Sequence, residues 1–569
     1  MHAPVYLRRR WRSLLLAGAA MLGLASAAQA QAPAKVWDRT LGGTHFDYLH
    51  AMRQTPDGGL LVGGSSQSGV SGDKSQPNVG NTDYWIVKLD GAGTKLWDRT
   101  YGGSNGEDFT CLELTKDGGF IIGGFSNSPA SYDKSQGSRG ETDYWIIKLD
   151  ANGQKQWDRT LGGAKSEALR VVRQTADGGY ILGGDSYSGA GGDKTGALRG
   201  IQDFWIVKLD AAGNKLWDRS IGGGNVEQLT GLQPTADGGY LLAGNSWSGA
   251  GGDKSASNFN READIWVVKL DGNGNKMWDK TFGGDSYDVC QDLQGTPDGG
   301  FILGGWSNSG ATGNKTQPSK GGNDFWVLRL DGLGTKLWDR AYGGSGHDQI
   351  YRLQPTADGG FAFAGGSSSP VSGDKTQGQR GNADYWLVKT DAAGTLQWDV
   401  TMGGNRDDFL WGLEQTMDGG LVMAGYSSSD AVGDKTHPGY NTAQPYGYNL
   451  DMWVVKVGGS ATAPPAPVVV VPPTAPPSES QAAPATLEAY PNPAHDQLTL
   501  RLPAAAPRTH LQLSLVSAQT GRPVLRQELG AAPAASSIPV SLLGQPAGLY
   551  LLQLSGPNGY RYSQRLVIE

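Results

Sequence analysis

One stretch of the chain decides its fold: residues 83–103, DYWIVKLDGAGTKLWDRTYGG. Its two halves are rich in aromatic and β-branched residues, which favour β-strands, and the Asp-Gly-Ala-Gly between them is typical of a tight turn. The Trp-Asp pair recurs at intervals of 60 or 61 residues, at Trp37, Trp97, Trp157, Trp217, Trp278, Trp338 and Trp398. A second tryptophan recurs in each copy, at Trp85, Trp145, Trp205, Trp266, Trp326, Trp386 and Trp453. The sequence is therefore built from seven copies of one structural unit.

The residue pattern of each copy predicts four short strands. In the first copy they cover residues 47–55, 60–66, 83–89 and 95–101. Asp57-Gly58-Gly59 joins the first two strands, and its glycines accept the positive φ that such a turn requires. Each copy is predicted to form a four-stranded antiparallel meander.

The two ends of the repeat region complement each other. Residues 35–41 form a lone fourth strand before the first copy, whereas the last copy, residues 408–457, lacks a fourth strand. An open array would leave two unpaired strand edges, which proteins avoid. Pairing residues 35–41 with residues 451–457 predicts an all-β fold, a seven-bladed β-propeller over residues 31–457 closed by the N-terminal strand.

The repeats resemble those of bacterial cell-surface β-propeller proteins. In this sequence the resemblance rests on the tryptophan, the Gly-Gly, the Asp-Gly-Gly hairpin and the Lys-Leu-Asp-x-x-Gly turn of each copy. The resemblance implies the fold and no particular activity, because propellers carry many functions.

The composition excludes two classes of protein. The chain has 569 residues, 88 of them Gly, and its net charge is -7, with no basic block outside the first dozen positions, so no nucleic-acid partner is expected. No apolar run reaches the roughly 18 residues that a membrane-spanning helix needs, so no transmembrane segment is expected in the mature chain. Cys111 and Cys290 fall in distant copies and are predicted to be buried without a disulfide.

Residues 1–30 have the pattern of a signal peptide. Arg8, Arg9 and Arg10 precede an apolar stretch from Leu14 to Leu24, and Ala28-Gln29-Ala30 is typical of a cleavage site. The pattern predicts export from the cytoplasm.

Residues 458–486 are rich in Pro and Ala and are predicted to form a linker, whereas residues 487–569 alternate like a small Ig-like β-sandwich. This last region resembles the C-terminal sorting domain of type IX secretion. The resemblance is carried by Tyr490, Pro491, Asn492, Pro493, Gly521, Gly548, Tyr550 and Arg565. It implies the type IX secretion machinery as a partner and an extracellular or outer cell-surface location.

A carboxylate stands ten residues before each Asp-Gly-Gly turn: Asp47, Glu107, Glu167, Glu227, Asp288, Asp348 and Asp408. One interpretation is a ring of metal sites, with structural calcium as the ion. Like charges repel, however, and a loop lysine, the arginine after Trp-Asp or a backbone N–H could satisfy each carboxylate, so structural pairing is favoured. The sequence identifies no cofactor.

Departures from the repeat are better candidates for a binding site than the repeated residues. The candidates are Phe125, Asp185, Tyr187, Trp247, Trp306 and Tyr426 at the exit of the second strand, with Tyr440, Tyr446 and Tyr448 in the longer seventh loop. Aromatic side chains suit the apolar faces of sugar rings, although they could also fill gaps between blades or cover the closure seam.

These observations favour an exported binding or adhesion module for a glycan or another surface polymer. No catalytic residue set stands out, so an enzyme is not favoured. The alternatives are a glycan-processing hydrolase or lyase built on the propeller and a purely structural envelope component.

Overall fold

A computed structural model describes residues 31–440 and 450–459 and, further on, residues 488–490, 497–501, 511–517, 523–529, 537–542, 548–555 and 561–568. The chain divides into two compact units, Met1–Val468 and Val469–Glu569. The predicted signal peptide, most of the predicted linker, and Tyr446, Tyr448, Pro491, Asn492, Pro493 and Gly521 lie outside the described residues. The described secondary structure is all β, and no helix in it could span a membrane.

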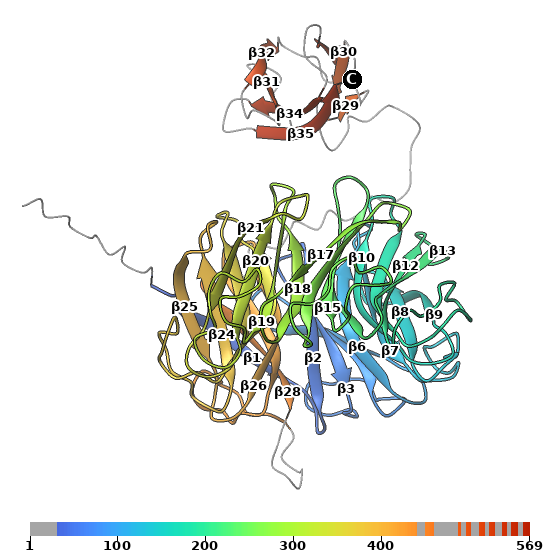
Figure 1. Cartoon of the computed structure of the whole chain (residues 1–569), viewed down its shortest axis with the longest axis vertical. Coiled ribbons are helices and arrows are strands. Elements are labelled where there is room, and N and C mark those ends of the chain that lie inside the picture. Colours follow the sequence, from blue (N-terminus) through green and yellow to red (C-terminus); the bar gives the residue numbers. More distant parts are fainter. Residues whose placement is uncertain are drawn as a thin grey trace, which may run out of the picture. The chain divides into compact units, whose positions relative to one another are not determined.

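The first unit is a series of four-stranded antiparallel sheets, one for each copy of the repeat (Figure 1). Sheet 1 contains β2 (Asp47–Gln54), β3 (Leu60–Ser66), β4 (Asp83–Leu89) and β5 (Lys95–Tyr101); sheet 2 contains β6 (Glu107–Leu114), β7 (Phe120–Ser126), β8 (Asp143–Leu149) and β9 (Lys155–Leu161). Sheet 3 contains β10 (Glu167–Gln174), β11 (Tyr180–Ser186), β12 (Asp203–Leu209) and β13 (Lys215–Ile221); sheet 4 contains β14 (Glu227–Pro234), β15 (Tyr240–Ser246), β16 (Asp264–Leu270) and β17 (Lys276–Phe282). Sheet 5 contains β18 (Asp288–Gly295), β19 (Phe301–Ser307), β20 (Asp324–Leu330) and β21 (Lys336–Tyr342); sheet 6 contains β22 (Asp348–Pro355), β23 (Phe361–Ser367), β24 (Asp384–Thr390) and β25 (Leu396–Met402). Sheet 7 contains β26 (Asp408–Gln415), β27 (Leu421–Ser427), β28 (Asp451–Val457) and β1 (Lys35–Leu41).

The predicted strands of the first copy are confirmed, except that the first ends one residue earlier, at Gln54. The predicted pairing of the chain's first strand is also present. β1 runs antiparallel to β28, with Lys35 opposite Val457 and Thr40 opposite Trp453. Sheet 7 is thus assembled from both ends of the repeat region.

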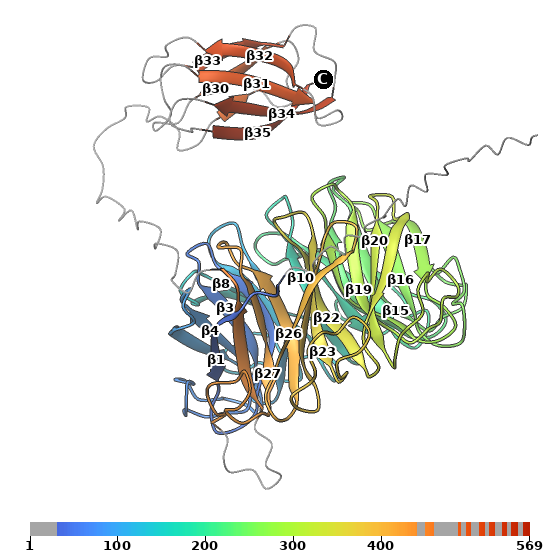
Figure 2. The same cartoon turned by 90° about the vertical axis from the view of Figure 1, so that its left-hand side faces the viewer.

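Neighbouring sheets contact each other through their innermost strands. β2 contacts β6, β6 contacts β10, and the series continues through β14, β18 and β22 to β26, which contacts β2. Figure 2 shows the sheets of this unit standing side by side. The arrangement is that of a β-propeller repeat.

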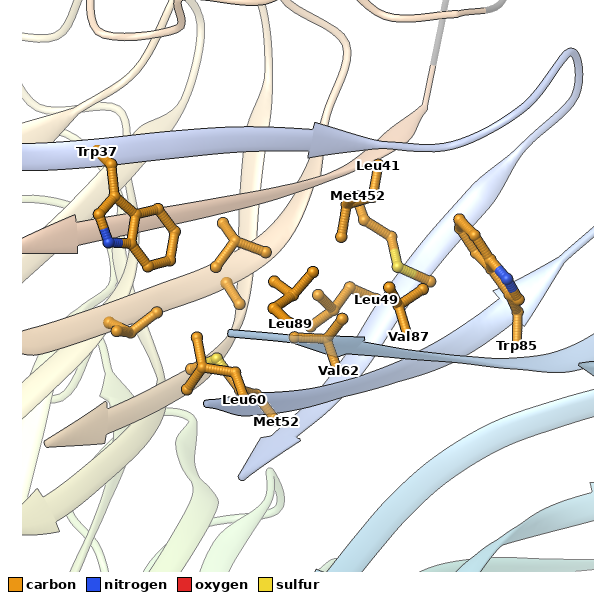
Figure 3. Close-up of a cluster of buried hydrophobic side chains, with 13 residues drawn as sticks. Trp37, Leu41, Leu49, Met52, Leu60, Val62, Trp85, Val87, Leu89 and Met452 are labelled. Atoms are coloured by element: carbon orange, nitrogen blue, oxygen red, sulfur yellow. The ribbon is translucent and has the colours of Figure 1, made fainter. Parts of the chain in front are cut away.

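The hydrophobic core lies between adjacent sheets. In the cluster of Figure 3, Leu49 and Trp85 from sheet 1 pack with Met452 from sheet 7, and all three are fully buried. Six further clusters join the other neighbouring sheets in the same way. Burial of large apolar side chains at every junction is the main source of stability for such a repeat.

The two repeated tryptophans have different roles. Trp205 is fully buried, and its indole N–H donates to Asp218, the aspartate of the Trp-Asp pair, over 3.1 Å. Trp157 packs against Gly213 in the turn of the next sheet, where a Cβ would lie 2.9 Å from the indole ring. Arg159 lies over that indole and donates to the carbonyl of Gly213, so the Trp-Asp-Arg sequence of this copy holds the turn of the next sheet.

Cys111 and Cys290 are both buried and free, as predicted. Burial raises the pKa of each thiol to about 12, so neither forms a thiolate near neutral pH.

The described strands of the second unit form two sheets. One contains β29 (Glu488–Tyr490), β30 (Gln497–Arg501) and β33 (Ser537–Ser541); the other contains β31 (Leu511–Ser517), β32 (Pro523–Leu529), β34 (Gly548–Ser555) and β35 (Arg561–Ile568). Four of the residues that carry the sorting-domain resemblance fall in paired strands: Tyr490 is opposite Thr499, Gly548 opposite Ile568, Tyr550 opposite Leu566, and Arg565 opposite Leu551. Tyr550 and Leu566 belong to the buried cluster of this unit.

Candidate functional site

A cavity of about 1220 Å³ lies among the innermost strands of all seven sheets. We call it the channel. Unlike the contacts between sheets, the side chains that line it differ from copy to copy. At one position of the innermost strand the seven copies carry His50, Thr110, Arg170, Thr230, Gln291, Tyr351 and Trp411. The channel is therefore the part of the repeat region where the copies are not equivalent.

An arc of alternating charges lies near the Asp-Gly-Gly ends of the innermost strands. Arg53 pairs with Glu113 over 3.5 Å and with Glu414 over 4.0 Å, and Arg173 pairs with the same Glu113 over 3.3 Å. The four side chains come from sheets 7, 1, 2 and 3. The other three sheets carry glutamines at this position, Gln233, Gln294 and Gln354. The charges in this arc compensate one another.

A second group of charges lies deeper in the channel wall. The Asp292 carboxylate accepts the backbone N–H of Leu353 over 3.0 Å, and Arg352 donates to the carbonyl of His50 over 3.4 Å. Burial, together with the positive charge of Arg352, lowers the pKa of His50 to about 4. The imidazole is therefore neutral at physiological pH and acts as an aromatic surface.

Sheets 6, 7 and 1 together present an aromatic arc. Its members are Tyr351, Trp411, His50, Phe409, Tyr426, Tyr48 and Phe46, and each is half-buried. The rings of Tyr351 and Trp411 lie 4.9 Å apart, and that of His50 lies 5.4 Å from Trp411. Tyr426 contacts Phe409 at 5.3 Å and Tyr48 at 5.2 Å. Mutual ring contacts hold these side chains in place while part of each remains accessible.

Sheets 2 and 3 line the channel with polar groups instead. Arg170 pairs with Asp185 over 3.0 Å, and Asp185 also accepts the backbone N–H of Leu229 over 2.7 Å. The side chain of Asp108 is exposed and, within the described residues, makes neither a hydrogen bond nor an ion pair. Desolvation inside the channel, together with the nearby negative charge of Glu107, raises its pKa. Of the aromatic arc, His50 and Trp411 line the channel, and Asp108, Arg170 and Asp185 line it from sheets 2 and 3.

The structure divides the predicted candidate residues among several places. Phe125 and Asp185 line the channel, and Tyr426 belongs to the aromatic arc. Trp247 lines a separate cavity of about 440 Å³ on sheet 4. Trp306 contacts Tyr287 at 6.4 Å, Tyr187 is 39% exposed, and Tyr440 is 41% exposed and donates its backbone N–H to Asp451. The candidates therefore do not form one surface.

The seven repeated carboxylates are fully buried, and none lines the channel. Glu227 is representative: it accepts the backbone N–H of Gly223 over 2.7 Å and the hydroxyls of Ser246 and Ser248. Burial raises its pKa. These bonds favour the structural interpretation. Within the described residues, no group of three His, Cys, Asp or Glu side chains is arranged to hold a metal ion.

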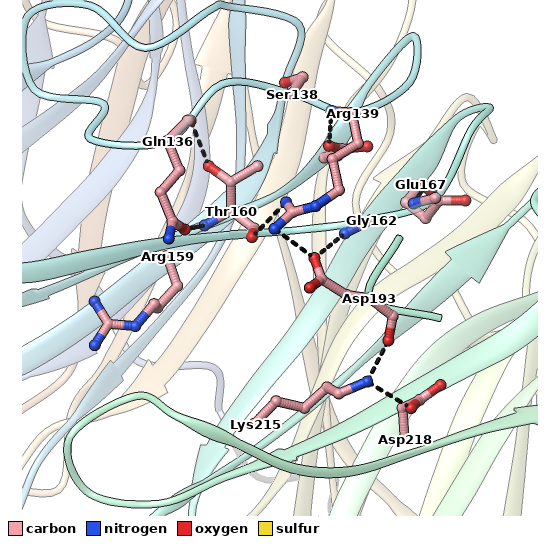
Figure 4. A network of polar contacts seen from close by, with 12 residues as sticks. Gln136, Ser138, Arg139, Arg159, Thr160, Gly162, Glu167, Asp193, Lys215 and Asp218 are labelled. Atoms are coloured by element: carbon pink, nitrogen blue, oxygen red, sulfur yellow. Dashed lines mark hydrogen bonds and ion pairs between the residues drawn. The ribbon is translucent and has the colours of Figure 1, made fainter. Parts of the chain in front are cut away.

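Long loops between the second and third strands of each sheet are joined across sheet boundaries. Figure 4 shows Arg139 of sheet 2 pairing with Asp193 of sheet 3 over 3.0 Å, while Asp193 also accepts the N–H of Gly162. Equivalent pairs link Arg199 with Asp253 and Arg380 with Asp434. Between sheets 4 and 5 this pair is absent. Asn314 takes the place of the aspartate in the loop of sheet 5, and Phe259 takes the place of the arginine in the loop of sheet 4, where it lies against Gly313. The two changes occur at the same seam.

Most residues of the aromatic arc were not among the candidates predicted from the sequence. Tyr48, Phe409, Tyr351 and Trp411 stand at positions that vary among the copies, which is the signal that identified Phe125 and Tyr426 at the exit of the second strand. Comparing the copies along the innermost strand would have found them.

Residues 488–569 match the family model of the secretion system C-terminal sorting domain. The chain therefore combines a β-propeller repeat region with a type IX sorting domain. This domain directs export to the outer-membrane surface or the medium and implies the type IX secretion machinery as a partner.

The chain is also similar to the regulatory protein FlaEY of Caulobacter vibrioides, with 26% identity over 245 residues, 40% of this chain. The match spans about a quarter of that protein, 26% of its length. Among solved structures, the Neurospora crassa Pan2 WD40 domain matches 75% of this chain and 96% of its own, with 10% identity and a TM-score of 0.39. Puromycin hydrolase matches 68% of this chain and 53% of its own, with 13% identity and the same TM-score, 0.39. Nothing about activity follows from these likenesses.

Proposed function

We propose that this chain is an exported binding or adhesion module: a seven-bladed propeller, closed by β1, that binds a glycan or another surface polymer in its channel. The observation that carries the proposal is the aromatic arc. In this assignment residues 1–30 are the signal peptide, residues 31–457 the propeller, residues 458–486 the linker and residues 487–569 the sorting domain.

The arc has the properties that a sugar-binding wall needs. Its rings are preorganised by contacts with one another, so little conformational entropy is lost when a ligand binds. Half-buried aromatic rings offer apolar faces to the C–H side of a sugar, while Asp108 and Arg170 offer hydrogen bonds to hydroxyls. Trp411, which lines the channel, offers a stacking face, and Tyr426 of the same arc offers a second one outside the cavity lining. Together with the polar contacts of sheets 2 and 3, they support binding of a polymer chain or chain end that enters the channel.

The test is affinity measurement of the purified chain with a panel of polysaccharides and bacterial envelopes, by co-sedimentation and calorimetry. We expect Trp411→Ala or Tyr426→Ala to weaken binding about tenfold, because each removes one stacking face. Tyr132→Ala, which removes a tyrosine that is 71% exposed outside the channel, is the matched control. Equal affinity of Trp411→Ala and the unaltered chain for every ligand would overturn the channel assignment.

A second candidate function rests on Asp108. It is an acid that does not repeat in the other copies, has no partner within the described residues and has a raised pKa, as a general acid in glycan hydrolysis requires. If the chain cleaves a polysaccharide, release of reducing ends is lost in Asp108→Asn while binding persists. Binding without any release leaves the adhesion module.

A further inference from the structure

We propose that the separate cavity on sheet 4 binds an anionic sugar residue, such as a uronic acid. This cavity is distinct from the channel, and the proposal holds whether or not the channel binds a polymer. It has a volume of about 440 Å³, and its walls include Trp247, Asn225, Ser257, Asn258, Asn260 and Arg261. This size falls within the usual range of small-molecule sites.

Trp247 is the apolar wall of the cavity. The other copies carry Gln67, Asn127, Tyr187, Asn308, Ser368 and Ser428 at this position, so the fold does not require an indole there. The backbone N–H of Trp247 donates to Val226 over 3.0 Å, which fixes the main chain. The indole is half-buried, and its N–H has no partner within the described residues.

An extra residue in the loop of sheet 4 creates the polar wall. Ten positions separate Lys254 from Asp264, whereas nine separate Lys74 from Asp83 in the first copy. The position of Gly80 is taken by Asn260. In the first copy a Cβ on Gly80 would lie 2.1 Å from a backbone oxygen, so an asparagine requires the rebuilt loop.

The rebuilt loop is held firmly. Asn260 donates to the carbonyls of Gly284 and Ser286 over 3.1 and 2.7 Å and accepts the N–H of Glu262 over 2.5 Å. Asn258 donates to the carbonyls of Ser246 and Glu262 over 2.6 and 2.8 Å. The residues on both sides of Arg261 are therefore fixed by hydrogen bonds.

Arg261 is the group that selects the ligand. It lines the cavity, is exposed, and makes no hydrogen bond or ion pair with any described residue. The neighbouring Glu262 bonds to the Tyr287 hydroxyl, whose pKa is raised by that bond. A guanidinium is charged at every physiological pH and binds a carboxylate through two parallel hydrogen bonds. An indole face beside an uncommitted guanidinium fits a sugar ring that carries a carboxylate.

Calorimetry of the full chain with trigalacturonate, and with its methyl ester as the neutral control, tests the proposal. We expect the chain to prefer trigalacturonate, and Arg261→Gln to lower that affinity at least tenfold without changing the weaker affinity for the ester. Trp247→Leu should weaken binding of both ligands. Lys165→Gln is the charge-matched control, because it removes one exposed positive charge from the connection between β9 and β10, away from the sheet 4 cavity.

Three outcomes would overturn the proposal: no binding of trigalacturonate, equal binding of acid and ester, or the same loss in Lys165→Gln as in Arg261→Gln. The melting temperature of each variant shows that it is folded. Trp411→Ala changes the channel and leaves the sheet 4 cavity intact. If this variant still binds trigalacturonate, the ligand does not depend on the channel, so the two sites can fail independently.

Discussion

Two tryptophans of this protein illustrate the difference between its framework and its channel. Trp205 recurs in every copy, is fully buried and donates to Asp218, whereas Trp411 occurs in one copy and lies half-buried beside Tyr351 and His50. In the framework, each sheet packs against the next in the same way, so the same residue types recur in each copy. The channel wall does not have to repeat, so its side chains are free to differ and to serve binding.

The largest expected effect is on the framework at the junction of the chain's two ends. Deleting residues 31–41 removes β1, leaves β28 as an unpaired edge and takes Trp37 and Leu41 out of the core. We expect the free energy of unfolding to fall by about 5 kcal/mol or more and the chain to self-associate through the exposed edge. Urea denaturation and analytical ultracentrifugation measure both effects. A chain that begins at residue 33 is the control, and unchanged stability of the deletion variant would refute closure by β1.

The next effect separates the two tryptophans directly. Trp205→Ala should lower the free energy of unfolding by about 3–5 kcal/mol, because it leaves a large cavity and an unpaired Asp218. Trp411→Ala should cost about 1 kcal/mol or less and act on ligand binding instead. Comparable losses of stability in the two variants would show that Trp411 belongs to the core.

A smaller effect is expected in the charged arc of the channel. Glu113→Gln removes the carboxylate that Arg53 and Arg173 share and leaves both guanidinium groups in a partly buried site. We expect a loss of about 1–2 kcal/mol, which thermal unfolding detects as a shift of a few degrees. Gln354→Glu is the informative partner variant, because it adds a carboxylate at the equivalent position of sheet 6. If Glu113→Gln is as stable as the unaltered chain, the arc contributes nothing to folding.

An effect that depends on pH is expected at a buried carboxylate of the framework. Burial raises the pKa of Asp264 to about 7; the Phe259 N–H and Lys254 lower it, and the nearby Asp288 raises it further. The folded chain then keeps a proton that the unfolded chain releases between about pH 4 and pH 7, so stability from this group is present at low pH and is lost as the pH rises. Asp264→Asn removes this group, so the free energy of unfolding should fall less steeply with pH. The slope should change by at most the contribution of one proton, about 1.4 kcal/mol per pH unit. Urea denaturation at pH 5 and pH 8 measures the slope, with Asp90→Asn in the half-buried turn between β4 and β5 as the control. An unchanged slope would show that Asp264 is ionised in the folded protein throughout this range.

Much of the framework could be predicted because it repeats. The strands of the first copy, the turn at Asp57-Gly58-Gly59 and the pairing of residues 35–41 with residues 451–457 followed from a pattern seen seven times. Each copy must pair its own strands and bury one face against the next copy, so the same local rules apply throughout.

The candidate sites were harder to predict. Phe125 lines the channel and Tyr426 lies in the aromatic arc, and the sequence offered each only as a single position. Of the two rings that contact Tyr426, Phe409 is opposite it on the neighbouring strand of sheet 7, whereas Tyr48 belongs to sheet 1, hundreds of residues away. Trp247 was identified without Arg261, although the extra residue that displays Arg261 was visible in the spacing of the copies.

The sequence by itself determined the repeat unit, its strand and turn positions, the burial of both cysteines and the sorting domain at residues 488–569. Each of these depends on neighbours along the chain or on a motif present in one segment. Only the tertiary structure decided which side chains share a wall of the channel and which guanidinium groups are already paired. Residues such as Tyr48 and Tyr426 meet because separate sheets are brought together. Whether an arginine has a partner depends on every segment that folds around it, and Arg261 has none among the residues that the structure describes.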